Sequence, residues 1–192
     1  MPSPSKRDQI VDVALDLFYQ GGFNATGVDK IALEAGVTKK TLYAHFKSKD
    51  ELILAVLRRR DEIFRNQFMR NVERLGKNPR QRLEAIFDTL DEWFNGKKFC
   101  GCMFINASAE FSDQGNPCHL VCAEHKRLMQ EYFRDLAEKA GAQDPDSLSE
   151  ELMFLAEGAT VQAHVCGDKR AGQKAKRMAR LFIDSAINLA GA

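Results

Sequence analysis

Hydrophobic residues recur at intervals of three and four along most of the chain, which is the spacing of amphipathic helices. In the first such segment, residues 5–20, the expected apolar face consists of Ile10, Val13, Ala14, Leu17 and Phe18. No segment shows the sustained alternation of apolar and polar residues that is typical of strands. The pattern therefore predicts an all-α protein.

Glycines, prolines and capping residues divide this pattern into about nine helices. Gly21-Gly22 and Gly36 end helices, because glycine readily takes the left-handed conformation. Asn116-Pro117 and Asp146-Ser147 have the character of helix starts, and Ser48 with Glu51 matches a capping box. The predicted helices span residues 5–20, 28–35, 38–46, 48–75, 80–95, 102–111, 117–140, 147–166 and 170–189. This arrangement is a small N-terminal three-helix unit, joined by a long helix to a C-terminal helical bundle.

Composition supports a soluble globular protein. The 192 residues are 44% hydrophobic and 29% charged, enough for one domain or two small ones that share a long helix. The N-terminus has no signal-peptide pattern, and no run approaches the roughly 18 apolar residues of a membrane span. We therefore expect a cytoplasmic protein without a membrane partner. The five cysteines fit reduced thiols, since an odd number cannot all pair within one chain.

Charge is distributed unevenly, although the net charge is only +1. Lys39, Lys40, Lys47 and Lys49 lie between Thr38 and Lys49 with no acidic residue among them. Such a local basic patch is expected of a DNA-contacting surface, although many charge runs are merely solvated faces.

The same region has the pattern of a helix-turn-helix, with helices at 28–35 and 38–46 joined by a turn at Gly36. Leu42 and Phe46 are expected to anchor the second helix. The residues left to face outward are Thr38, Lys39, Lys40, Thr41, Tyr43 and His45. Lysine, threonine and tyrosine can all donate to phosphates, and the first two also to base edges. A helix pair of this kind is nevertheless common in all-α proteins.

The residue types in this region help to decide between a DNA-binding helix-turn-helix and an ordinary helix pair. Phe23-Asn24-Ala25-Thr26, Val28, Ile31-Ala32, Ala35-Gly36-Val37-Thr38-Lys39, Thr41-Leu42-Tyr43, His45-Phe46 and Ser48-Lys49 resemble the TetR/AcrR family of bacterial regulators. The resemblance covers about residues 6–60. It implies a homodimer that binds a palindromic double-stranded DNA operator, with the third helix of each subunit in the major groove. It also implies a C-terminal pocket for a small-molecule effector whose occupancy weakens DNA binding. The expectation is a ligand-responsive repressor, neither an enzyme nor a cofactor-binding protein.

The resemblance assigns roles to individual residues. The DNA-binding domain would be residues 1–50, with residues 24–50 at the DNA, and the ligand-binding and dimerisation domain would be residues 51–192. Thr26, Lys39, Tyr43, His45 and Lys49 match positions that usually contact the DNA backbone, whereas Thr38, Lys40 and Thr41 face the groove. Lys47 and Lys49 flank a helix start suited to phosphate. Gly27 lacks the small hydroxyl usual at its position, so we expect Thr26 to cap the second helix. Lys40 is larger than usual there and could read guanine or add a phosphate contact.

The resemblance implies that the last two helices form a dimeric four-helix bundle, although their small and apolar residues could instead be buried within the monomer. These residues are Leu148, Leu152, Leu155, Ala159, Ala163, Met178, Leu181, Phe182, Ser185 and Leu189. A nearby basic run (Lys169, Arg170, Lys174, Lys176, Arg177, Arg180) is interpreted as a solvated face. Candidate pocket residues, which could equally be core, are Trp93, Phe94, Phe104, Asn106, Phe111, His125, Met129, Phe133, Phe154 and Gln162; His164 is a further possible polar handle.

The cysteines leave alternatives open. Cys118, Cys122 and His125 share one helical face and could bind a thiophilic metal with Cys100 or Cys102, or gate the same DNA-binding scaffold by thiol oxidation. Equally, free cysteine is a small buried hydrophobe, and without a paired Cys-x-x-Cys motif we predict no metal site. A thiol redox enzyme is the remote alternative, since no catalytic motif accompanies these residues.

Overall fold

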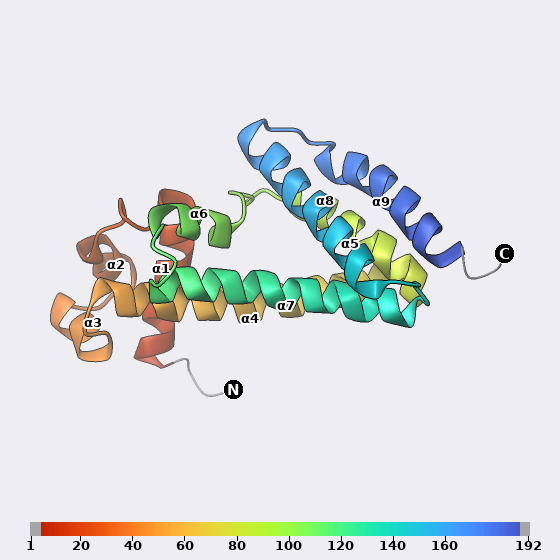
Figure 1. Ribbon diagram of the computed structural model, residues 1–192. Coiled ribbons are helices and arrows are strands. Elements are labelled where there is room, and N and C mark those ends of the chain that lie inside the picture. Colours follow the sequence, from red (N-terminus) through yellow and green to blue (C-terminus); the bar gives the residue numbers. More distant parts are fainter. Residues whose placement is uncertain (1–4, 189–192) are drawn as a thin grey trace. The chain divides into compact units, whose positions relative to one another are not determined.

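Residues 5–188 are described by a computed structural model, and this part of the chain contains nine α-helices and no strand (Figure 1). They are α1 (Lys6–Gly21), α2 (Val28–Glu34), α3 (Lys39–His45), α4 (Lys49–Leu75), α5 (Pro79–Phe94), α6 (Met103–Glu110), α7 (Pro117–Lys139), α8 (Pro145–Val165) and α9 (Ala171–Asn188). The all-α prediction is confirmed, and each predicted helix is present. The predicted end of the last helix at Leu189 lies outside the described residues.

Local capping explains most helix starts. Ser5 Oγ accepts from the Asp8 amide at 3.1 Å, so the first helix starts with a filled cap. The predicted start of α8 at Asp146-Ser147 is wrong by two residues. Asp144 is the cap, its carboxylate accepting from the Ser147 amide at 3.0 Å, and Pro145 occupies the first turn. Proline is tolerated there because its missing N–H has no partner within the helix.

The described chain separates into two compact units. Unit 1 consists of the chain up to Phe64 together with Cys102–His125, and unit 2 consists of Arg65–Gly101 and the chain from Lys126 onward. Helices α4 and α7 each begin in unit 1 and end in unit 2. The expected boundary at residue 50 separates a DNA-binding domain from a ligand-binding and dimerisation domain, not two compact units. That boundary stays a prediction.

Unit 1 is built on α1, α2 and α3, which pack against one another. The buried face of α1 is Ile10, Val11, Ala14, Leu15 and Phe18. Val13 and Leu17, which we expected on this face, are only half-buried, because the helix is rotated by about one position from the expectation. Phe18 stacks on Phe23, with ring centroids 5.2 Å apart, and this stack closes the end of α1 against the following turn.

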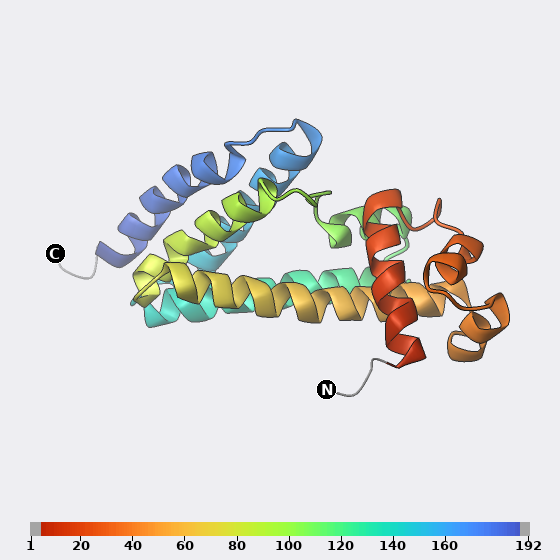
Figure 2. The same ribbon diagram turned by 180° about the vertical axis from the view of Figure 1, so that it is seen from behind.

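Unit 2 is built on α5, α8 and α9, which pack against one another and can be followed from both sides in Figures 1 and 2. Leu148 and Leu152 of α8 and Ile183 of α9 are fully buried, so they belong to the core of the unit. Along the other elements of the unit, Phe68 stacks on Phe133 at 6.3 Å. None of the helices in residues 5–188 is both long enough and apolar enough to cross a membrane.

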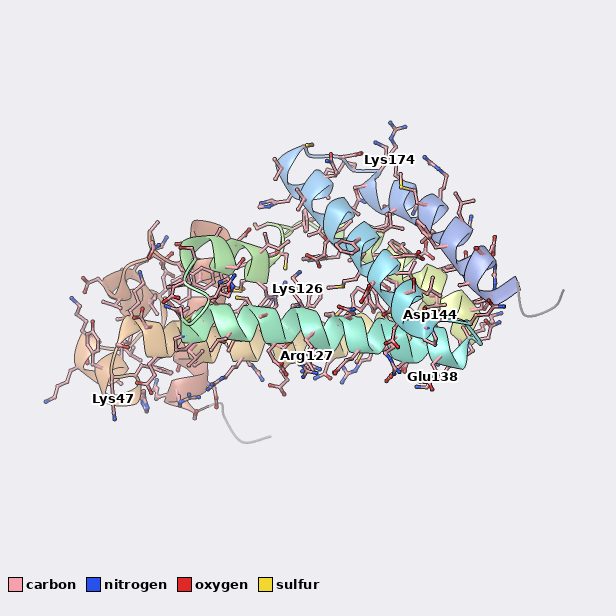
Figure 3. All side chains as sticks on the ribbon, in the orientation of Figure 1. Lys47, Lys126, Arg127, Glu138, Asp144 and Lys174 are labelled. Carbon is pink, nitrogen blue, oxygen red and sulfur yellow. The ribbon has the colours of Figure 1, made fainter. Side chains whose placement is uncertain are left out.

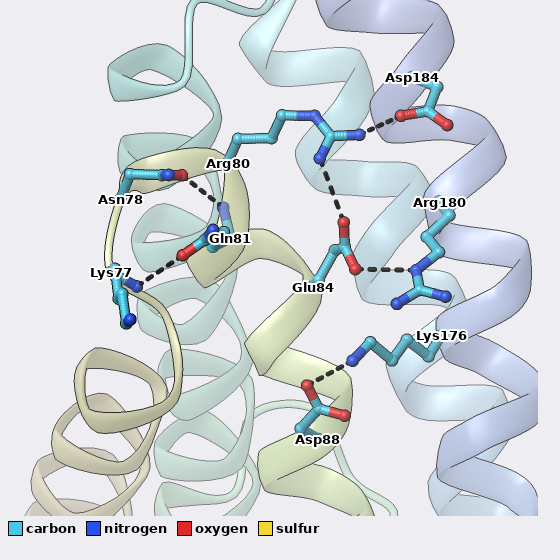
Figure 4. A network of polar contacts seen from close by, with 9 residues as sticks. All are labelled: Lys77, Asn78, Arg80, Gln81, Glu84, Asp88, Lys176, Arg180 and Asp184. Carbon is cyan, nitrogen blue, oxygen red and sulfur yellow. Dashed lines mark hydrogen bonds and ion pairs between the residues drawn. The ribbon is translucent and has the colours of Figure 1, made fainter.

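A polar network runs between α5 and α9 (Figure 4). Glu84 pairs with Arg180 at 2.8 Å and with Arg80, which also reaches Asp184. Lys176 pairs with Asp88 at 2.5 Å. Much of the basic run of α9 is therefore paired with acidic residues of its own unit. Partly exposed pairs of this kind contribute little stability individually, but their opposite charges favour one register of α9 on α5.

Candidate DNA-binding surface

The turn between α2 and α3 is fixed by backbone hydrogen bonds. The amides of Gly36 and Val37 donate to the carbonyls of Leu33 and Ala32 at 3.1 and 3.0 Å. Gly36 has a φ of 61°, in the left-handed region that glycine adopts without strain. The direction in which the chain leaves α2 is therefore set locally.

Helix α3 is anchored by one apolar face. Leu42 and Phe46 are 0% exposed, as is Ile31 of α2. The Arg7 guanidinium lies 5.0 Å from the centroid of the Phe46 ring, an arrangement that permits a cation–π interaction. The predicted anchors are thus buried, and the opposite face of α3 must point away from the core.

That opposite face carries the predicted polar residues. Thr38, Lys39, Lys40, Tyr43 and His45 are exposed, and Thr41 is half-buried. Thr38 caps α3 by accepting from the Thr41 amide at 3.1 Å, and the two hydroxyl oxygens are 2.9 Å apart. Both hydroxyls therefore lie together at the N-terminal end of α3, the end that a helix-turn-helix presents to base edges.

Lys39 has an acidic partner that was not among the predicted site residues. Its Nζ lies 2.8 Å from a carboxylate oxygen of Asp29, and the hydrogen bond followed by the charge of Asp29 raises the pKa of Lys39. Both side chains are largely exposed, so solvent screens the pair. An acidic residue in the first turn of a helix is already explained by the helix dipole, so the sequence contains no separate signal for this pairing.

The start of α4 lies beside this surface. Ser48 Oγ accepts from the Glu51 amide at 3.1 Å, while Glu51 reaches back to the Lys47 amide at 2.7 Å. The Lys49 ammonium donates to the Asn24 carbonyl at 3.2 Å. Lys47 is exposed beyond the end of α3 (Figure 3), which leaves its ammonium group open to a phosphate.

Thr26 departs from the prediction. It is only 4% exposed, and its hydroxyl donates to the Gly22 carbonyl at 2.7 Å. The N-cap of α2 is Gly27, and no side chain caps this helix. The prediction that Thr26 caps α2 is therefore wrong, because its hydroxyl bonds the end of α1. Because the Thr26 side chain is buried, it is not accessible for the contact with the DNA backbone that was expected of it.

The candidate pocket residues are divided between the two units. Phe104, Asn106, Phe111 and His125 belong to unit 1, whereas Trp93, Phe94, Met129, Phe133, Phe154 and Gln162 belong to unit 2. In unit 1, Phe104 stacks on His125 with centroids 3.7 Å apart. In unit 2, Trp93, Phe94 and Phe99 pack together, with centroids between 5.1 and 5.6 Å apart.

Two of these residues lie on the surface. Phe154 is 78% exposed, and Gln162 is also exposed. Both line a groove between α8 and α9 that is open to solvent. Phe154 was a candidate because of its aromatic ring and Gln162 as a polar contact, but the core of unit 2 covers a different face of α8. Their assignment to an interior pocket is therefore not supported by their position.

The cysteines are mostly inaccessible. Cys102, Cys118 and Cys122 are buried, Cys100 is half-buried, and Cys166 is exposed. Burial, and to a smaller extent the charge of Asp50, raises the pKa of the Cys118 thiol. Among the residues that the structure describes, no three histidine, cysteine or acidic side chains are grouped as a metal site would require.

Comparison with known proteins adds two domain matches. Residues 10–56 match the bacterial regulatory proteins of the tetR family, and residues 79–179 match the tetracyclin repressor-like C-terminal domain. The HTH-type transcriptional activator FasR of Mycolicibacterium smegmatis is 41% identical over 96 residues, which are 47% of this chain and 43% of FasR. The match thus spans less than half the length of that relative.

Solved structures resemble the chain over nearly its whole length. A TetR-family transcriptional regulator from Streptomyces coelicolor has a TM-score of 0.87 and 26% identity, covering 94% of this chain and 95% of that one. A tetR transcriptional regulator from Streptomyces avermitilis has a TM-score of 0.82 and 30% identity, covering 95% and 98%. The helix-turn-helix geometry, both domain matches and these structures agree. The chain therefore belongs to the TetR family of bacterial transcriptional regulators, which are DNA-binding proteins rather than enzymes.

Proposed function

We propose that the chain is a ligand-responsive transcriptional repressor that binds a palindromic operator as a homodimer and releases it when an effector binds. The observation that carries the proposal is the outer face of α3. Its polar residues are exposed, or half-buried in the case of Thr41, while Leu42 and Phe46 on the opposite face are 0% exposed. A helix fixed in this way can enter the major groove without losing its own core contacts.

The contacts divide into two kinds. Thr38, Lys40 and Thr41 lie toward the start of α3 and are the proposed base-reading residues. The proposed backbone contacts are Lys39, Tyr43, His45, Lys47 and Lys49, which are exposed or half-buried. Thr26 is left out because its hydroxyl is turned inward.

The dimer interface is proposed on α8 and α9, the helices expected to pair. Phe154 and Val165 of α8 are 78% and 74% exposed, and Leu181 and Met178 of α9 are 72% and 51% exposed. Several large apolar side chains on adjacent helices mark an association surface rather than a solvated one. Two such surfaces would form a four-helix bundle between two copies of the chain. This interface would hold two copies of α3 for the two halves of a palindrome.

For the effector we propose the aromatic cluster of unit 2 as a contact. Trp93 is half-buried against Phe94 and Phe99, the mixture of apolar surface and access that small-molecule sites use. Trp93 is also the single tryptophan of the chain, so its fluorescence reports on this cluster alone. Asn106 and His125 remain candidate polar contacts in unit 1.

The test is binding of the full chain to DNA from the region upstream of its own gene. Three lysines per protomer are proposed to contact phosphates, so affinity should fall about a thousandfold between 50 and 200 mM salt. A reporter gene behind this DNA should be silenced by the protein. Binding that is independent of salt, or absent, would sink the DNA-binding proposal. Activation of the reporter would overturn only the assignment as a repressor.

A further inference from the structure

Glu110, the last residue of α6, holds the turn that follows α1. Its Oε1 accepts from the Phe23 amide at 2.8 Å, and its Oε2 accepts from the Asn24 amide at 2.6 Å. Each carboxylate oxygen therefore has its own backbone donor, and hydrogen bonds to an ionised acceptor are the stronger kind. The partners are more than 80 residues apart in the chain, and all three residues belong to unit 1.

Local helix rules do not explain a glutamate at this position. The last carbonyls of a helix carry partial negative charge, so a carboxylate at the C-terminus of α6 is disfavoured. The hydrogen bonds from the Phe23 and Asn24 amides compensate for this unfavourable position of the carboxylate. The packing around them is close: Phe111 meets Phe23 edge-on at 5.9 Å, and a Cβ added at Gly22 would lie 3.2 Å from Glu110 Oε1.

The Asn24 residue connects this contact to the DNA-binding surface. Its amide donates to Glu110, and its own carbonyl accepts from the Lys49 ammonium at 3.2 Å. Lys49 begins α4 and is a proposed phosphate contact. A row of hydrogen bonds thus runs from Glu110 through Asn24 to Lys49.

We infer that Glu110 is a positioning residue for DNA binding: it fixes the turn after α1 so that the Asn24 carbonyl directs the Lys49 ammonium toward the phosphate backbone. This inference rests on the DNA-binding surface proposed above. It also makes a prediction opposite to that of simple electrostatics. Removing a negative charge near DNA should strengthen binding, whereas losing the positioning contact should weaken it.

The experiment measures the affinity of the full chain for a fluorescent duplex that the wild-type protein has selected from a random-sequence pool, over a series of salt concentrations. Glu110→Gln keeps the size of the side chain but loses the charge and one acceptor. We expect roughly tenfold weaker binding. The slope of log affinity against log salt concentration should also become shallower, by about one released ion per protomer. In a Lys49→Ala background the same change should cost no more than about threefold, because the two residues act through one contact. Glu110→Asp keeps the charge but cannot reach both amides, so it should also weaken binding.

Asp113→Asn is the matched control. It removes one negative charge three residues further along and keeps the acceptor for the Gly115 amide, so its binding should be equal to wild type or slightly tighter. Circular dichroism confirms that each variant is folded at the assay temperature. The inference is overturned if folded Glu110→Gln and Glu110→Asp bind like the wild type, or if the effects of Glu110→Gln and Lys49→Ala multiply. Failure of the wild-type protein to select any duplex overturns the proposed function and this inference together.

Discussion

The His125 imidazole is held between a carboxylate and an aromatic ring inside unit 1. Its Nδ1 lies 2.7 Å from Asp61 Oδ1, and its ring stacks on Phe104 with centroids 3.7 Å apart and planes inclined by 14°. Phe64 meets the same ring edge-on at 5.8 Å. His125 is 3% exposed, so the interaction ties α4, α6 and α7 together away from water.

We therefore expect His125 to stabilise the fold of unit 1. His125→Ala removes a stacked ring and leaves the Asp61 carboxylate without this partner, so the free energy of unfolding should fall by about 2–4 kcal/mol. Asp61→Asn keeps an acceptor for an Nδ1–H and should cost clearly less. Urea denaturation of the two variants measures both values. Equal losses for the two, or no loss for His125→Ala, would show that the stack and hydrogen bond contribute little.

Tyr132 should make the stability of the chain sensitive to high pH. Its hydroxyl is buried and has no hydrogen-bond partner among residues 5–188. Burial and the charge of Glu73 raise its pKa from 10.0 to about 12, although the charge of Arg82 acts in the opposite direction. The folded chain therefore retains this proton to higher pH than the unfolded chain. The resulting stabilisation is fully present below pH 10 and is lost as the pH rises toward 12.

Tyr132→Phe isolates this effect because phenylalanine cannot ionise. At pH 7 the variant should be at least as stable as wild type, since it removes an unpaired buried hydroxyl. Its advantage should grow by roughly 1–2 kcal/mol between pH 9 and 11.5. Urea denaturation across this range gives the difference at each pH. Two parallel stability curves would contradict the assigned shift in pKa.

The exposed thiol of Cys166 should react before the buried ones. Thiolate is the reactive form, and burial raises the pKa of Cys118 while keeping reagents away from it. A disulfide reagent at neutral pH should give one fast reaction that mass spectrometry assigns to Cys166 and that Cys166→Ser abolishes. Fast modification of Cys102, Cys118 or Cys122, accompanied by loss of DNA binding, would instead support gating by oxidation.

The apolar face of α8 and α9 should determine the oligomeric state. Leu181→Glu places a charge where 72% of the side chain is exposed in the single chain, and a dimer would bury it. We expect monomers in sedimentation experiments and at least tenfold weaker operator binding. Leu120→Glu, at a 54% exposed leucine of unit 1, is the control that should remain dimeric. A dimeric Leu181→Glu protein would place the interface elsewhere.

Sequence patterns predicted the parts of this fold that local physics controls. Helix lengths, the Thr38 cap and the buried Leu42 and Phe46 follow from periodicity and from hydrogen bonds between near neighbours. Periodicity could not decide which apolar face of α8 is covered. That helix has Leu152 in the core and Phe154 in solvent, so only packing against α5 and α9 separates the two.

Two side-chain contacts to the backbone did not follow from local rules. The Thr26 hydroxyl bonds the end of α1 instead of capping α2, and Glu110 binds amides more than 80 residues away. Both side chains satisfy backbone groups whose need for a partner becomes visible only in three dimensions. For the DNA-binding surface, type and spacing of residues predicted the exposed face of α3. They contained no signal for Asp29, which forms an ion pair with the Lys39 ammonium.

The most direct test of the central claim, that α3 reads DNA, is a comparison of the sequences selected from a random duplex pool by wild type, Thr41→Ala and Tyr43→Ala. Tyr43→Ala should weaken binding to every duplex alike and leave the preferred sequence unchanged, because a phosphate contact carries no base information. Thr41→Ala should change the preferred base at one symmetry-related pair of positions. If Thr41→Ala and Tyr43→Ala both retain the affinity and the preferred sequence of the wild type, α3 is not the helix that reads the operator.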